Sequence, residues 1–114
     1  MKKIVMSRFI LTLLAILALA ACAQPLPPEK SSYAGNWQSA AMGLLITQDG
    51  NVAYKRRIGS NTTKSVRGPL QSFEGNNFIV GVWPLKVTFE VSVPPHEVHG
   101  RWKMTVDGVE LTRE

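Results

Sequence analysis

The chain has 114 residues, which is enough for one small domain. A hydrophobic fraction of 45% excludes an intrinsically disordered chain, because disordered chains lack the apolar side chains needed to form a core. The formal net charge of +5 admits nucleic acid or an anionic membrane surface as a partner, until the N-terminal segment is considered.

The first 21 residues have the parts of a secretory signal peptide. Lys2, Lys3 and Arg8 give a positive start, and residues 9–21 form an uncharged apolar run that ends in small residues. This run is shorter than the roughly 20 apolar residues that a membrane-spanning helix needs. We therefore expect residues 1–21 to be a signal peptide that is removed.

The only cysteine of the chain follows this run directly. The sequence Leu19-Ala20-Ala21-Cys22 resembles the lipobox of bacterial lipoproteins. The resemblance implies that the Cys22 sulfur, a nucleophile, receives a diacylglycerol, that the chain is cut before Cys22, and that the new amine takes an N-acyl chain. Two or three acyl chains give stable anchoring to a membrane.

The residues around the cleavage site also bear on location and charge. Aspartate after the lipidated cysteine commonly retains Gram-negative lipoproteins at the inner membrane, so Ala23 implies the outer membrane of the cell envelope. Loss of Lys2, Lys3 and Arg8 from the 13 basic residues leaves ten against eight acidic ones. The mature charge of about +2 gives little reason to expect nucleic acid as a partner. No cysteine remains for a disulfide.

The next segment has the composition of a tether. Residues 22–32 contain Pro25, Pro27 and Pro28 among polar residues, which favours an extended spacer with a reach of about 30 Å. The folded domain is then expected over residues 33–114.

The pattern after residue 33 is that of β-strands. Residues 85–93 (LKVTFEVSV) and residues 101–106 (RWKMTV) alternate apolar and polar side chains, as strands with one buried face do. Asp49-Gly50 and Asp107-Gly108 are hairpin signals, and Pro94-Pro95 is expected to end the strand before it. The strands are expected at residues 35–40, 43–48, 51–58, 65–74, 77–83, 85–93, 97–106 and 109–113.

Short connections between these strands favour pairing of sequence neighbours. The expected fold is all-β: a small antiparallel up-and-down β-barrel of seven to eight strands, because closure removes exposed edges. A β-sandwich is the alternative.

Residues 35–37 (GNW) resemble the start of lipocalin-like (calycin-type) β-barrels. The resemblance implies that Trp37 closes one end of the barrel and that Arg113, in the last strand, packs over its ring in a cation–π contact. It also implies a carrier of a small apolar ligand. The C-terminal helix of true lipocalins has no counterpart here, and a small eight-stranded barrel is filled by its own side chains.

Sequence motifs for catalysis are missing from the chain. It has no Gly-x-Ser-x-Gly elbow, no phosphate loop and no metal-ligand cluster. His96 and His99 lie three residues apart beside two prolines, which places them on opposite faces of a strand. We expect no enzyme, no catalytic residue and no metal site.

A run of basic residues is the candidate binding site. Lys55, Arg56, Arg57, Lys64 and Arg67 lie within thirteen residues with no acidic residue among them. Such a hairpin can contact anionic lipid, lipopolysaccharide phosphates or an acidic protein. The alternative is a solvated hairpin whose charges only keep the surface soluble. A further residue, Trp83, is either a core residue or an exposed contact.

The sequence therefore favours a lipid-anchored, non-catalytic binding or scaffold module of the bacterial envelope. Its expected partner is an envelope protein or an anionic surface component. Two alternatives remain open: a carrier of a small apolar ligand in the barrel, and an inhibitor of an envelope-attacking enzyme such as lysozyme. The sequence predicts no oligomeric state.

Overall fold

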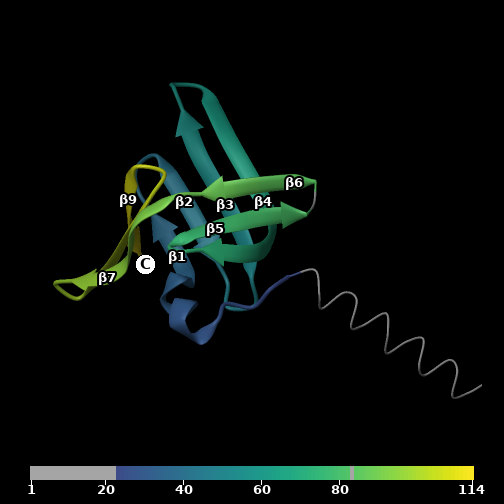
Figure 1. Cartoon of the computed structure of the whole chain (residues 1–114). Helices are drawn as coiled ribbons and strands as arrows, with labels where there is room; N and C mark the ends of the chain where they lie inside the picture. Colours follow the sequence, from purple (N-terminus) through teal and green to yellow (C-terminus); the bar gives the residue numbers. More distant parts are fainter. Residues whose placement is uncertain (1–22, 83) are drawn as a thin grey trace, which may run out of the picture.

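The computed structural model describes residues 23–82 and 84–114, and it confirms the all-β class (Figure 1). The expected signal peptide (residues 1–21), Cys22 and Trp83 lie outside the described residues. Within the described residues the elements are a 3-10 helix η1 (Pro28–Tyr33) and nine strands: β1 (Gly35–Gln38), β2 (Met42–Ile46), β3 (Asn51–Ile58), β4 (Thr62–Glu74), β5 (Asn77–Val82), β6 (Leu85–Phe89), β7 (Val91–Val98), β8 (Arg101–Val106) and β9 (Val109–Arg113).

The strands form one curled antiparallel sheet in the order β6-β5-β4-β3-β2-β1-β9-β8-β7. Nearly every strand pairs with its neighbours in sequence, and β1 also pairs with β9. The two end strands, β6 and β7, are consecutive in the chain and are separated only by Glu90. A single extended segment therefore pairs with β5 through its first half and with β8 through its second half. This change of partner explains why nine strands are observed where seven or eight were expected.

The turn between β8 and β9 is hydrogen-bonded to Glu90, the residue at which this segment changes its strand partner. The Glu90 N–H donates to the Asp107 carboxylate (2.9 Å), and the Asp107 N–H donates to the Glu90 carbonyl (2.8 Å). Asp107 and Gly108 have φ values of +48° and +79°, as a two-residue type I′ hairpin requires. The Asp-Gly signal thus supplies both the hairpin and a clasp on the neighbouring strand.

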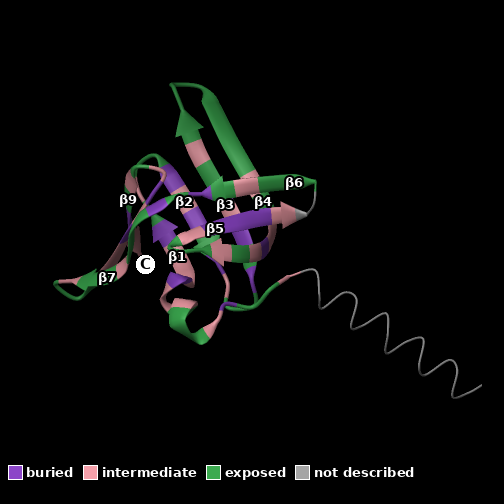
Figure 2. Cartoon of the chain, in the orientation of Figure 1, coloured by how far each residue is buried: buried purple, intermediate pink, exposed green. Residues whose placement is uncertain are grey.

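Buried side chains, most of them from the strands, fill the interior of the curled sheet. Figure 2 marks the buried residues in purple along these strands. The Phe78 and Phe89 rings stack with their centroids 5.0 Å apart, and Tyr54 meets Phe89 edge-on at 5.0 Å. The largest fully buried side chains are Trp37, Phe78, Phe89, Leu44, Leu70, Met104, Leu111, Val80 and Val106. They come from both halves of the sheet, so the core joins the two halves.

The prediction that Pro94-Pro95 ends a strand is wrong. Strand β7 continues through both prolines to Val98, with register shifts against β8 on either side of Val93. β7 has a strand partner on one side only. Prolines are tolerated at sheet edges and at bulges, because no ladder hydrogen bond is lost there.

The segment expected as a free spacer packs against the sheet from residue 24 onward. The Gln24 N–H donates to the Leu70 carbonyl (3.2 Å), and the Leu26 N–H donates to the Gln48 carbonyl (3.0 Å). The Leu26 side chain is 8% exposed and belongs to the core. Gly50 has φ +93°, and a Cβ at this position would overlap the Gln24 carbonyl. The β2–β3 turn is therefore shaped to receive this segment.

Candidate binding groove

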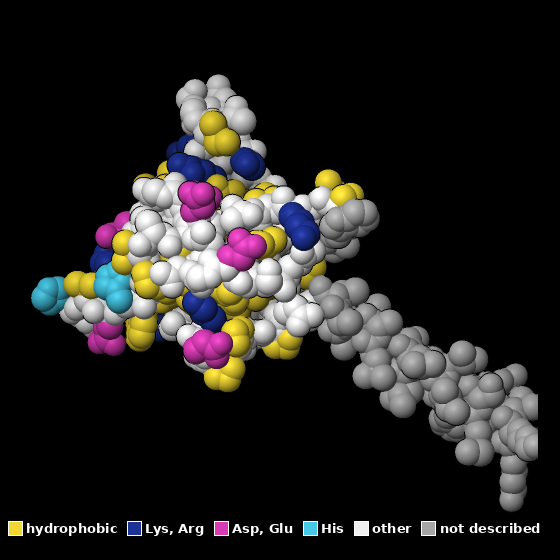
Figure 3. Space-filling model, in the orientation of Figure 1, with side chains coloured by type: hydrophobic (Ala, Val, Ile, Leu, Met, Phe, Trp, Pro, Cys, Tyr) yellow, Lys and Arg dark blue, Asp and Glu magenta, His cyan; other side chains and the backbone are white. Residues whose placement is uncertain are grey.

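The β3–β4 hairpin divides the five predicted basic residues between two faces. Strand alternation places Lys55 and Arg57 on the outer face of β3, next to the buried Tyr54 on the inner face. Arg67 pairs with Ala53 and so joins the outer face, whereas Lys64 pairs with Arg56 on the opposite face. Figure 3 shows Lys and Arg side chains gathered on this hairpin. The structure thus brings three of the five cations together.

These three cations border an open groove of about 490 Å³ on the outer face of β1 to β4. Small residues, including Gly43, Ala53 and Ser65, also line the groove, while the long cationic side chains stand around them. The sheet is hollowed here because its outward positions alternate between residues with almost no side chain and residues with long ones. Gly43 is half-buried, and a Cβ there would reach van der Waals contact with the Gln38 amide.

A second hollow of about 310 Å³ adjoins the first and shares Leu45, Ala53 and Arg67 with it. Its lining is less polar and includes Pro69. Leu45 is 44% exposed between the two hollows. Sequence reasoning missed this apolar part. The available signal was residues 42–46 (MGLLI), a strand whose alternation puts one leucine outside.

The groove carries positive charge without compensation from its own lining. Lys55, Arg57 and Arg67 are exposed, and no Asp or Glu lines either hollow. Within residues 23–82 and 84–114 the only ion pair joins Lys103 to Glu110 (3.2 Å), on β8 and β9. Asn36, which lines the groove, donates a hydrogen bond from its side-chain amide to the Glu114 carboxylate at 3.1 Å, but Glu114 itself does not line the groove. Such a surface attracts anions, and an arginine guanidinium can hold a carboxylate or phosphate with two parallel hydrogen bonds.

Trp37 and Arg113 lie at the end of the barrel that η1 covers. The Arg113 guanidinium is 5.7 Å from the Trp37 ring and 4.8 Å from the Trp102 ring. Trp37 is fully buried, and its indole N–H donates to the Tyr33 carbonyl (2.9 Å). The arginine also lies within 3.4 Å of the Ser32 and Ala34 carbonyls. These contacts join β1, β8, β9 and η1, and neither Trp37 nor Arg113 lines the groove.

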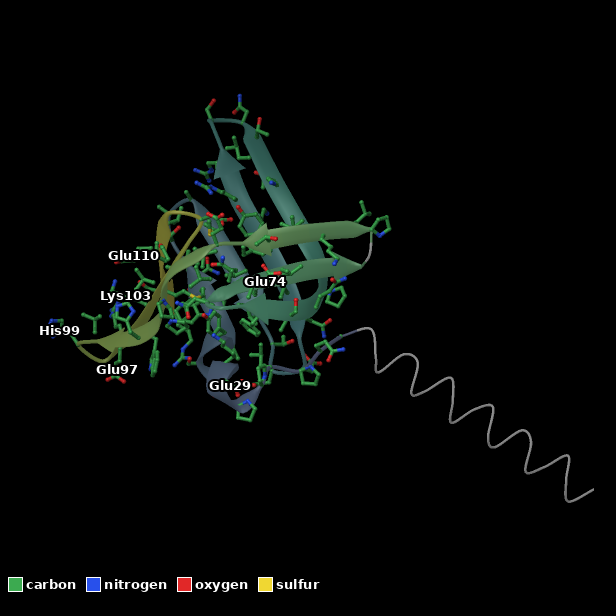
Figure 4. The ribbon with its side chains drawn as sticks, viewed as in Figure 1. Glu29, Glu74, Glu97, His99, Lys103 and Glu110 are labelled. Carbon is green, nitrogen blue, oxygen red and sulfur yellow. The ribbon has the colours of Figure 1, made fainter. Side chains whose placement is uncertain are left out.

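The titratable residues outside the groove are spread over the described part of the chain. No group of three or more His, Cys, Asp or Glu side chains is placed to hold a metal ion in residues 23–82 and 84–114. His96 and His99 are exposed on the β7–β8 hairpin, and Figure 4 shows the labelled glutamates spread over separate elements. In the same part of the chain no helix is long and apolar enough to cross a membrane.

We compared the chain with family models, curated proteins and solved structures. No family model matches the chain. Neither the curated proteins nor the solved structures yield a match. The groove must therefore be judged on its own residues.

Proposed function

We propose that the protein is a lipid-anchored, non-catalytic binding module of the bacterial cell envelope. Its outer groove holds an anionic group of an envelope partner, between Lys55, Arg57 and Arg67. The observation that carries the proposal is the set of three cations around a hollow that no acidic residue lines. The anchor is the lipid on Cys22, as the lipobox resemblance implies.

The shape of the groove supports an extended partner rather than a small ion. The basic hollow of about 490 Å³ continues into the less polar one of about 310 Å³ through Leu45 and Arg67. A segment with acidic side chains at one end and an apolar side chain at the other complements both parts. Because the cations are exposed, each ion pair contributes about 0–1 kcal/mol, and binding weakens as salt is added.

Two features weigh against the alternatives. A carrier of an apolar ligand needs an interior cavity, whereas fully buried side chains such as Trp37, Phe78 and Phe89 fill the interior of the described residues. An inhibitor of lysozyme, a basic enzyme, needs acidic groups on its contact surface. The groove here presents the opposite charge.

The test is a titration of the lipidated protein in uncharged nanodiscs, followed by the NMR shifts of its backbone amides. The probe is a glutamate-rich peptide with one leucine, and inorganic phosphate is titrated separately. With the peptide we expect salt-sensitive shifts at Ser65 and Arg67 beside the cations, together with shifts at Leu45 and Gly68 in the less polar hollow. Phosphate is expected to shift only amides near the cations.

Two charge-matched variants decide whether the groove is the site. Arg57→Glu/Arg67→Glu is expected to abolish peptide binding. Lys64→Glu/Arg101→Glu changes net charge equally at exposed positions that do not line the groove, and is expected to retain most of the binding. Equal loss in both variants contradicts the proposal, because binding would then follow net charge alone.

A further inference from the structure

The tip of the β5–β6 hairpin exposes apolar side chains to solvent. Leu85, the first residue of β6, is 78% exposed, more than any other large hydrophobic residue in the described chain. Pro84 before it and Lys86 after it are also exposed. Figure 3 shows hydrophobic atoms at this tip. An exposed leucine beside a lysine can enter a lipid interface, because the apolar side chain goes into the acyl region while the ammonium group stays at the headgroups.

The same tip lies beside the point where the described chain begins. Gln24 is hydrogen-bonded to Leu70, and Leu70 pairs with Val80 in β5. The next residue along β5, Gly81, pairs with Lys86 of the tip. In Figure 1 the β5–β6 tip and the start of the described chain lie on the same side of the barrel, and the β3–β4 tip points elsewhere.

Packing of the N-terminal segment makes the link to the anchor very short. Only Ala23 separates Cys22 from Gln24, whose backbone is bonded to the sheet. At about 3.5 Å per residue, two residues reach about 7 Å, well below the about 30 Å of a free ten-residue spacer. A lipid on Cys22 therefore holds this side of the barrel against the bilayer.

We propose that the β5–β6 tip inserts into the membrane interface beside the lipid anchor, with Leu85 among the acyl chains and Lys86 at the headgroup phosphates. The proposal rests on the lipidation of Cys22 in the proposed function. It fixes the orientation of the barrel on the membrane. Asn51, the first residue of β3, lies next to the packed N-terminal segment. Arg57 is six residues further along the strand, so about 20 Å separate Arg57 from Asn51. The Arg57 end of the groove then stands off the bilayer, where it meets a partner rather than the headgroups around the anchor.

The test uses a fluorescent label on the lipidated protein. Because the Cys22 sulfur is blocked by its lipid, Leu85→Cys introduces the single reactive thiol, which takes an NBD dye. The matched control is Ser60→Cys, exposed in the β3–β4 turn. Both proteins are reconstituted in vesicles of phosphatidylethanolamine and phosphatidylglycerol that contain nitroxide-labelled lipid.

We expect blue-shifted emission and strong nitroxide quenching from position 85, and water-like emission with weak quenching from position 60. Equal, water-like emission from both positions overturns the tip insertion while leaving the anchor intact. The mass of the same samples tests the anchor separately. A mature chain without lipid on Cys22 overturns the anchor, and the insertion proposal with it.

Discussion

Replacement of Leu26 by alanine tests whether the N-terminal segment is part of the fold. The Leu26 side chain is 8% exposed and packs in the core, although it lies only four residues after the proposed lipid site. A free spacer would make no such contact. The variant therefore separates a packed segment from a flexible one.

The size of the effect follows from the burial. Leucine-to-alanine changes in cores cost about 2–5 kcal/mol, and a site at the edge of the core belongs at the lower end, about 2–3 kcal/mol. In a domain of this size each kcal/mol lowers Tm by about 4–8 °C. Leu26→Ala is thus expected to lower Tm by roughly 8–24 °C.

The assay is thermal and urea unfolding of the lipidated protein in micelles, followed by circular dichroism. Leu85→Ala is the matched control, since the same change at a side chain 78% exposed is expected to alter stability by less than about 0.5 kcal/mol. If Leu26→Ala is no more destabilising than Leu85→Ala, the segment does not pack on the barrel. The short anchor link inferred from it is then wrong.

Three further predictions concern the barrel end and one turn. Burial raises the pKa of Tyr33, so the unfolded chain loses this proton first as the pH passes about 10, and stability falls. Tyr33→Phe loses the hydrogen bond to the Asn76 carbonyl and about 1 kcal/mol of stability at neutral pH. Its free energy of unfolding, measured with urea, should then fall less steeply as the pH rises above about 10. The same steepness in both proteins would refute Tyr33 ionisation as the cause of the decline. Gly35→Ala should cost about 1–3 kcal/mol, because Gly35 has φ +145° and an added Cβ would overlap the Arg113 side chain; an unaltered Tm would contradict both causes. Hydrogen bonding from the Thr47 hydroxyl lowers the pKa of the Asp49 carboxyl in the folded protein. The ionised carboxylate therefore stabilises the fold above pH about 4, and this stabilisation is lost as the pH falls through the folded-state pKa of Asp49. Asp49→Asn should flatten the acid limb of a Tm-against-pH curve, and an identical limb argues against this role.

The strands were predictable from the sequence because the signals are local. Period-two alternation identifies residues 85–93 and 101–106, and Asp107-Gly108 specifies its hairpin through two positive φ values. The change of partner at Glu90 was not predictable. Phe89 and Val91 are both buried on either side of it, so the alternation runs on unbroken while the pairing changes.

The groove was only partly predictable, because it depends on register. Alternation alone places Lys55 and Arg57 on one face, but the position of Arg67 opposite Ala53 depends on the length of the β3–β4 turn. The packing of Leu26 was hidden for a different reason. A single leucine among three prolines has no period, and its burial depends on a site built by Gln48 and Leu70 far along the chain.

Site-specific photocrosslinking in the native envelope tests the binding function most directly. A photoreactive residue replaces Ser65 in the groove, and a second protein carries it at Ser92, which is exposed on β7. We predict one discrete adduct from position 65, lost when Arg57→Glu/Arg67→Glu is added, and no equivalent adduct from position 92. An adduct from position 65 that survives the charge reversal, or equal adducts from both positions, contradicts a partner held by the cations of the groove.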